Sequence, residues 1–185
     1  MENFCYDPKQ LVQLSGDGNG VGCLPPSIIS ILQKQRQFMS GMMTLRQLSF
    51  SELDLALHSA IIPDQGDTLK AFEVERTLST KYDLIPRLED DRFLCSFSHI
   101  FGGGYSAGYY SYKWSEVYSA DAYNEFDGKY NEELSRVGEK YRNTVLALGG
   151  GSEPADVWKQ FCGRTDANVD ALLKYDGLDN IKVTQ

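Results

Sequence analysis

A stretch of seventeen residues, from Ser98 to Trp114, combines residue types that could bind a ligand. It contains three consecutive glycines, four tyrosines, one tryptophan and one of the two histidines in the chain. Glycine lets a backbone approach another group closely, because it has no Cβ and tolerates positive φ. Tyrosine offers a flat apolar ring and a hydroxyl that donates or accepts a hydrogen bond. The stretch therefore predicts either a glycine loop that leads into an aromatic binding wall, or a tight turn that leads into an ordinary buried helix.

The residues from 105 or 106 to about 126 are expected to form a helix. Successive residues of a helix turn by roughly 100°, so the stretch presents two faces. The first face carries three phenols and a carboxylate: Tyr105, Tyr109, Tyr112 and Glu116. The opposite face, expected to be mostly core, carries Tyr110, Trp114, Val117 and Asp121. Because buried hydroxyls need hydrogen-bond partners, three phenols on one face are an unusual filling for a core.

Most of the remaining chain shows the three- and four-residue apolar spacing that is typical of helices. Helices are expected over 25–63, with one possible break at Ser40–Gly41, and over 68–82, 131–148, 153–162 and 169–176. Their expected caps are Asn131, Ser152 and Asn168 at the N-termini and Gly177 at the last C-terminus. A glycine-rich connector is expected over 14–24 and a turn over 64–67. Residues 93–97 are expected to form a short strand or a buried extended segment.

Several kinds of catalytic site find no support in the sequence. No HExxH motif is present, and the two histidines, His58 and His99, lie 41 positions apart, so no metal site is evident. His58 is expected to be a partly buried histidine near a helix C-terminus. There is no GxSxG motif, and nothing supports a Cys–His pair. Residues 102–107 fit G-x-G-x-x-A, but the helical surroundings provide no parallel sheet for a dinucleotide.

Composition and charge exclude other classes of protein. The 185 residues, 42% hydrophobic and 24% charged, are typical of one globular domain, 1–185. The net charge of −8 argues against a nucleic-acid partner. No apolar run is long enough for a membrane span, and the first residues do not resemble a secretory signal. The four cysteines have no CxxC spacing and are expected to be reduced thiols. A cytoplasmic location is expected, with the mitochondrial or plastid matrix as the alternative.

Residues 97–117, FSHIFGGGYSAGYYSYKWSEV, resemble the C-terminal signature of the M3 family of zinc oligopeptidases. The resemblance continues through nearly the whole chain, including residues 1–4, 38–41, 46–48, 57–58, 119–122, 149–154, 161–164 and 170–173. It implies an all-α fold, the C-terminal helical part of a zincin-type catalytic domain with at most minor β structure. It also implies a deep channel that admits only short peptides.

The resemblance assigns roles to the stretch described first. His99 and Tyr112 are implied to stabilise the transition state, with the phenol of Tyr112 directed at the oxyanion. Tyr105 and Tyr109 are implied to position the peptide. The glycines Gly102, Gly103 and Gly104 are implied to be the hinge of a loop that closes over the substrate.

The sequence departs from the family in one decisive respect. The family holds its zinc with the two histidines of HExxH and a later glutamate, and this chain contains neither the motif nor the third ligand. Because zinc makes the water nucleophile near neutral pH, the chain is expected to be a C-terminal portion of such an enzyme and inactive alone. The missing N-terminal part would then be its partner. The alternative is a non-catalytic helical module that binds peptides or a separate polypeptide.

Overall fold

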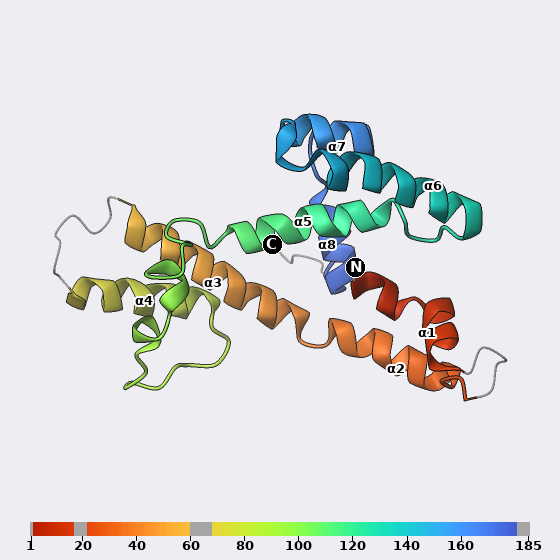
Figure 1. The fold of residues 1–185 in the computed structure, drawn as a ribbon. Helices are drawn as coiled ribbons and strands as arrows, with labels where there is room; N and C mark the ends of the chain where they lie inside the picture. The colour runs from red at the N-terminus through yellow and green to blue at the C-terminus, as the bar shows by residue number, and fades with distance from the viewer. Residues whose placement is uncertain (1, 17–21, 60–67, 181–185) are drawn as a thin grey trace. The chain divides into compact units, whose positions relative to one another are not determined.

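The computed structural model describes residues 2–16, 22–59 and 68–180, and these residues form an all-helical structure (Figure 1). Within these ranges, eight α-helices follow one another: α1 Pro8–Ser15, α2 Pro26–Gln37, α3 Ser40–His58, α4 Thr68–Tyr82, α5 Ser111–Asn124, α6 Asn131–Tyr141, α7 Pro154–Cys162 and α8 Val169–Asp176. Shorter helical turns are η1 Glu2–Tyr6, η2 Phe93–Cys95, η3 Ser98–Ile100, η4 Arg142–Leu146 and η5 Gly149–Gly151. No strand occurs in these ranges, which confirms the predicted all-α class.

The chain divides into two compact units. Unit 1 comprises Met1–Phe38 and Val117–Gln185, and unit 2 comprises Met39–Glu116. In unit 2, the helices α3 and α4 run side by side (Figure 1). The apolar centre of unit 2 is built from four buried residues: Phe50, Phe97, Ile100 and Tyr109.

Polar contacts also join α3 to α4 within unit 2. Glu52 of α3 accepts hydrogen bonds from the Lys81 ammonium, 2.7 Å from Oε2, and from the Tyr82 hydroxyl of α4. These two donors hold the pKa of Glu52 below its usual value. The Arg87 guanidinium lies 2.7 Å from Glu75 Oε1 and joins the connector after α4 to that helix.

Unit 1 has its own apolar centre, with Ala122, Trp158 and Phe161 buried. A buried carboxylate supports this centre. Asp121 is fully buried, receives two hydrogen bonds of 2.6 and 2.7 Å from the Arg164 guanidinium, and accepts a third, of 2.8 Å, from the Asn168 N–H. The end of α5 is thereby joined to the segment between α7 and α8.

Several predicted boundaries match the structure. The helix α4 has its predicted bounds, and Asn168 and Gly177 cap α8 as expected. The predicted break near Ser40–Gly41 is confirmed, because α2 ends at Gln37 and α3 begins at Ser40 after Met39, whose φ is 59°. The predicted turn at 64–67, residues 17–21 of the connector, and the end of the 25–63 helix beyond residue 59 lie outside the described residues.

Other predicted boundaries are wrong. The short strand or buried extended segment expected over 93–97 is not found: the structure has the turn η2, in which the Cys95 N–H donates to the Arg92 carbonyl, and then η3 from Ser98. This segment still buries Leu94 and Phe97. Asn131 is the first residue of α6, whose cap is Tyr130, and Glu153 rather than Ser152 precedes α7.

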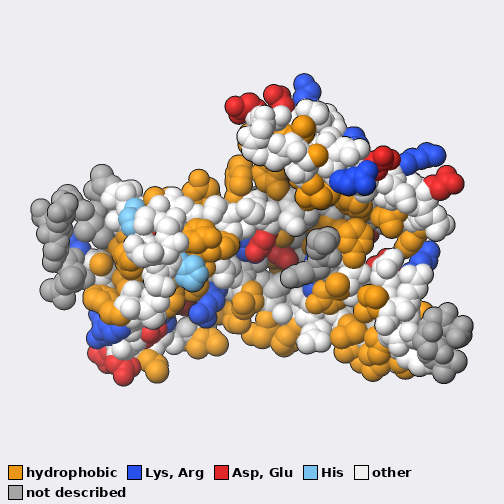
Figure 2. All heavy atoms as spheres, viewed as in Figure 1, with side chains coloured by type: hydrophobic (Ala, Val, Ile, Leu, Met, Phe, Trp, Pro, Cys, Tyr) orange, Lys and Arg blue, Asp and Glu red, His pale blue; other side chains and the backbone are white. Residues whose placement is uncertain are grey.

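Hydrophobic side chains also lie at the surface, as the face drawn in Figure 2 shows. The most exposed ones in unit 2 are Leu84, Ile85 and Leu88, which are 70–78% exposed on the connector after α4. None of the helices in the described ranges combines the length and the hydropathy of a membrane-spanning helix.

Candidate functional site

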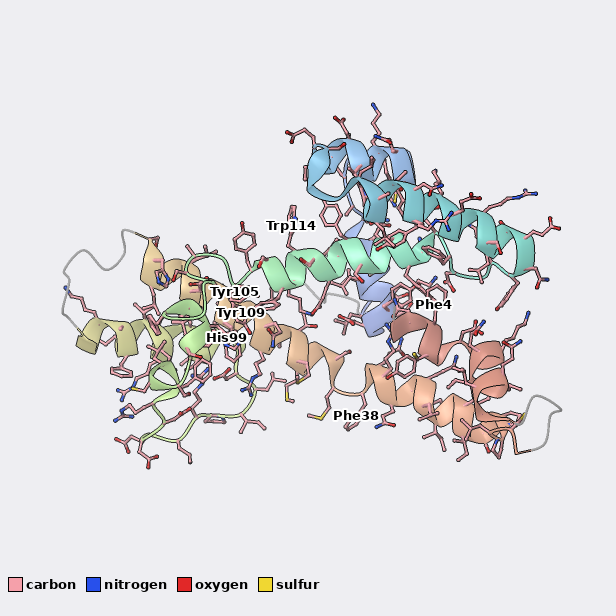
Figure 3. The ribbon with its side chains drawn as sticks, in the orientation of Figure 1. Phe4, Phe38, His99, Tyr105, Tyr109 and Trp114 are labelled. Atoms are coloured by element: carbon pink, nitrogen blue, oxygen red, sulfur yellow. The ribbon has the colours of Figure 1, made fainter. Side chains whose placement is uncertain are left out.

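Four aromatic side chains of the Ser98–Trp114 stretch meet in unit 2, and we call them the tyrosine cluster: His99, Tyr105, Tyr109 and Tyr112. The Tyr105 and Tyr112 rings are stacked, with centroids 4.8 Å apart, and the Tyr109 ring lies 5.0 Å from that of Tyr112. The imidazole of His99 lies within 6.4 Å of all three phenol rings. Figure 3 shows His99, Tyr105 and Tyr109 gathered together, whereas Trp114 points away from them. The structure thus brings together all the aromatic residues predicted for the site.

The backbone that carries the cluster differs from the predicted one. The helix expected from residue 105 or 106 to 126 is shorter, because α5 covers only Ser111–Asn124. Residues 105–110 form successive turns instead, in which the Gly108 N–H donates to the Tyr105 carbonyl and the Ser111 N–H to the Gly108 carbonyl. These turns advance by about three residues each, so the side chains still converge as helical spacing predicted.

The predicted opposite face is partly wrong. Asp121 is buried, but Tyr110 is 48% and Trp114 62% exposed, so neither is a core residue. Tyr110 lies in the turns that precede α5, and Trp114 lies in the first turn of that helix. Glu116, predicted beside the tyrosines, forms an ion pair with Lys113 at 2.5 Å.

The hydroxyls of Tyr109 and Tyr112 are held as neutral hydrogen-bonding groups. The buried Tyr109 hydroxyl donates to Gln47 Oε1 of α3 at 3.1 Å, and burial raises its pKa. The hydrogen bond between the Tyr105 and Tyr112 phenols, together with partial desolvation, raises the pKa of Tyr112 to about 12. Near neutral pH, Tyr112 is therefore a protonated phenol that can donate a hydrogen bond.

The glycine loop before the cluster is wound around one carbonyl. The Ser98 carbonyl oxygen accepts hydrogen bonds from the N–H groups of Phe101, Gly102 and Gly103 at 2.8–3.2 Å. A Cβ on Gly103 would lie 2.8 Å from the His99 Cα, and Gly104 has a φ of +81°. Glycine is therefore required at both of these positions, for steric reasons at the first and for backbone conformation at the second.

This geometry predicts that Gly103→Ala destabilises the loop while Gly102→Ala does not. The new methyl group at residue 103 meets backbone atoms that cannot move aside, so the free energy of unfolding should fall by about 1–3 kcal/mol. A Cβ at Gly102 meets nothing within 4 Å, and its effect should stay within about 0.5 kcal/mol. Urea denaturation of the two variants measures the difference, and equal midpoints would show that the loop is not packed in this way.

A residue that the sequence did not single out lies directly behind the cluster. Asp54 of α3 is fully buried and accepts hydrogen bonds from the N–H groups of Ala107 and Tyr109 at 2.9 and 2.8 Å. His58, one helical turn later, places its Nδ1 2.9 Å from Asp54 Oδ1. This confirms His58 as a partly buried histidine at a helix C-terminus. The sequence signal that could have identified Asp54 is a carboxylate within an apolar helical stripe, four residues before a histidine.

The described residues do not fit a zinc ion. Within them, no three or more His, Cys, Asp or Glu side chains are grouped closely enough to hold a metal. The four cysteines, Cys5, Cys23, Cys95 and Cys162, form no disulfide with one another. His99, the histidine of the cluster, has aromatic rings around it rather than other ligating groups.

Cys162 should differ in reactivity from the exposed Cys95. Burial raises the pKa of the Cys162 thiol to about 12, and the thiolate is the reactive form. Iodoacetamide near neutral pH should therefore modify Cys95 of the folded chain and leave Cys162 unmodified until urea is added, as peptide mass spectrometry can measure. The folded state holds the Cys162 proton more tightly than the unfolded state does. The free energy of unfolding should therefore fall as the pH rises from the ordinary pKa of 9.0 toward about 12. Equal modification of both thiols in the folded chain would contradict this account.

Comparisons of the sequence with known proteins identify its family. A sequence model of peptidase family M3 matches residues 1–176. The probable cytosolic oligopeptidase A of Arabidopsis thaliana is 44% identical over 96% of this chain and 25% of its own length. The organellar oligopeptidase A of the same plant is 42% identical over 96% of the chain and 22% of its length. Oligopeptidase A of Escherichia coli is 36% identical over 96% of the chain and 26% of its own length. The chain spans about a quarter of the length of these relatives, and it belongs to peptidase family M3.

Proposed function

We propose that this chain is the part of an oligopeptidase that lines the substrate channel and holds short peptides during their hydrolysis. The observation that carries the proposal is the tyrosine cluster, in which three phenols and an imidazole meet behind a tightly wound glycine loop. Two relatives, each of which matches the chain over about a quarter of its own length, are named oligopeptidase A. The family relationship supports the class of substrate, and the cluster supports the role of these residues.

The chemistry of the cluster suits the carbonyl group of a peptide bond. Tyr112 is 37% exposed, and its protonated phenol can donate a hydrogen bond to the oxyanion that develops in the transition state. His99 is exposed and has a ring N–H donor in either tautomer. We assign these two residues to transition-state stabilisation. Tyr105 and Tyr109 are assigned to peptide positioning, and Gly102 to Gly104 to the hinge of the loop.

The nucleophile and the metal are not supplied by these residues. M3 peptidases are metallopeptidases, and zinc in such enzymes activates a water molecule. Because the described residues do not fit the ion, no step through zinc is assigned to them. We therefore propose that the chain alone has no peptidase activity, and that the rest of the oligopeptidase is its partner. The names of the two plant relatives support a cytosolic, mitochondrial or plastid location.

A hybrid enzyme tests this function. The matching quarter of the Arabidopsis cytosolic relative is replaced by this chain, and hydrolysis of a fluorogenic short peptide is measured. The hybrid should show turnover that a chelator abolishes, whereas the purified chain with added zinc should show none. Chelator-sensitive turnover by the chain alone, or a folded hybrid without any turnover, would overturn the proposal.

A non-catalytic role is the second candidate, and the exposed apolar side chains of unit 2 favour it. Leu84, Ile85 and Leu88 are 70–78% exposed on one short connector, and apolar side chains that gather at a surface often mark a binding site for another protein. A chain that binds short peptides stably by calorimetry, together with a hybrid that folds but does not turn over, would support this second role.

A further inference from the structure

We propose that Asp54 is the positioning residue of the tyrosine cluster: its buried carboxylate fixes the turn 107–109 and thereby sets the places of Tyr105, Tyr109 and Tyr112. The positioning itself is a property of unit 2. Only its consequence for peptide hydrolysis rests on the proposed function.

The Asp54 carboxylate is fully buried. A carboxylate without solvent access is very costly unless charge-assisted hydrogen bonds compensate for the lost water. Each Asp54 oxygen receives one such bond from the turn: Oδ1 from the Ala107 N–H at 2.9 Å, and Oδ2 from the Tyr109 N–H at 2.8 Å. Each oxygen of the carboxylate thus accepts a hydrogen bond from this one turn, which lies more than fifty residues away in the sequence.

The turn that Asp54 holds contains a residue in an unfavourable backbone conformation. Ala107 has a φ of +56°, in the left-handed region that favours glycine. Such a residue persists only where its surroundings impose the conformation. The N–H of this strained residue is one of the two that Asp54 holds. The carboxylate therefore holds the turn at the point where the backbone would otherwise relax.

The helix α3 holds Tyr109 at two places. Asp54 binds its backbone N–H, and Gln47, two helical turns earlier on the same helix, accepts a hydrogen bond from its hydroxyl. His58 Nδ1 lies 2.9 Å from Asp54 Oδ1 and also contacts the carboxylate. The Tyr109 ring is therefore fixed in both position and direction by a single rigid helix.

The position of Tyr109 is passed on to the other two phenols through backbone contacts. The Tyr112 N–H donates to the Tyr109 carbonyl, and the Gly108 N–H donates to the Tyr105 carbonyl. If the turn relaxes, Tyr105 and Tyr112 no longer start from positions that stack their rings 4.8 Å apart. The hydrogen bond between their hydroxyls should then be lost.

Asp54→Asn in the full chain tests the positioning, with Asp121→Asn as the matched control. Both carboxylates are fully buried and accept a backbone N–H, but Asp121 lies in unit 1, outside the cluster. The ionisation of Tyr112 is followed by NMR of isotope-labelled tyrosine rings, with Tyr112→Phe identifying the signal. In the wild type and in Asp121→Asn, Tyr112 should ionise near the high pKa of about 12, and in Asp54→Asn near the ordinary 10.0. An unchanged Tyr112 ionisation in a folded Asp54→Asn chain would overturn the proposal.

Amide hydrogen exchange of the wild type keeps the proposal testable if Asp54→Asn does not fold. The N–H groups of Ala107 and Tyr109 should be protected as strongly as those in the middle of α3. Exchange as fast as at exposed turns would overturn the proposal as well.

The hybrid enzyme adds the consequence for hydrolysis. Asp54→Asn should lower kcat at least tenfold, with a smaller change in KM, because it displaces a group that acts in the transition state. If Tyr112→Phe has no effect on the hybrid, the proposed function fails while the NMR result still decides whether Asp54 positions the cluster. The two claims are therefore distinguishable.

Discussion

Replacing Tyr112 by phenylalanine in the hybrid enzyme is expected to lower kcat by about 100- to 1,000-fold, the usual cost of removing one donor to an oxyanion. KM should change little, because the lost hydrogen bond strengthens only in the transition state. The removed hydroxyl is the one whose pKa the Tyr105 hydrogen bond raises to about 12. Steady-state kinetics with a fluorogenic short peptide measure both constants.

Tyr110→Phe is the matched control for this prediction. Tyr110 is two residues earlier and 48% exposed, and its ring is not part of the tyrosine cluster. The control should retain the kcat of the unmodified hybrid. A similar loss in both variants would mean that the region tolerates no change, and a retained kcat in Tyr112→Phe would exclude the proposed role of this phenol.

The largest expected effect on stability is that of Arg164→Ala in unit 1. The Arg164 guanidinium makes two hydrogen bonds to the fully buried Asp121. Removing one partner of a buried ion pair typically costs about 3–5 kcal/mol, because the other charge remains buried without compensation. The Arg164 side chain is itself 38% exposed, so water can partly replace it, and we expect a loss of about 3 kcal/mol.

Arg136→Ala provides the control for Arg164→Ala. The Arg136 side chain lies 3.7 Å from Glu132 and both side chains are at least 80% exposed, so its loss should cost less than about 1 kcal/mol. Urea denaturation followed by circular dichroism compares the two variants with the wild type. Equal shifts of the two midpoints would contradict the assigned role of the Asp121–Arg164 pair.

The sequence predicted the helices better than it predicted their ends. Apolar spacing of three and four residues was sufficient to locate α4, because packing on one face fixes such a helix. The start of α5 was predicted too early, since glycine at position 108 and a left-handed residue at 107 favour turns that spacing alone does not reveal. The short strand or buried extended segment predicted over 93–97 was wrong for a related reason: a short, mostly apolar segment is compatible with either an extended chain or buried turns.

The meeting of the three tyrosines could be predicted from local spacing, and its support could not. Tyr105, Tyr109 and Tyr112 lie within eight residues at helical spacing, whereas His99 was assigned to the site only through the family resemblance. Asp54 meets the turn 107–109 across 53 and 55 positions of sequence. Such a contact depends on how α3 packs against the loop, which one sequence does not disclose.

Photo-crosslinking in the hybrid enzyme tests most directly whether the tyrosine cluster lines the peptide site. A short peptide that carries a benzophenone group is irradiated with the hybrid, and the modified residues are identified by mass spectrometry. We predict crosslinks within residues 99–112 that an excess of unlabelled peptide abolishes. Competable crosslinks that avoid these residues, whether at the exposed connector 84–88 or wholly within the relative's own sequence, would contradict the central claim.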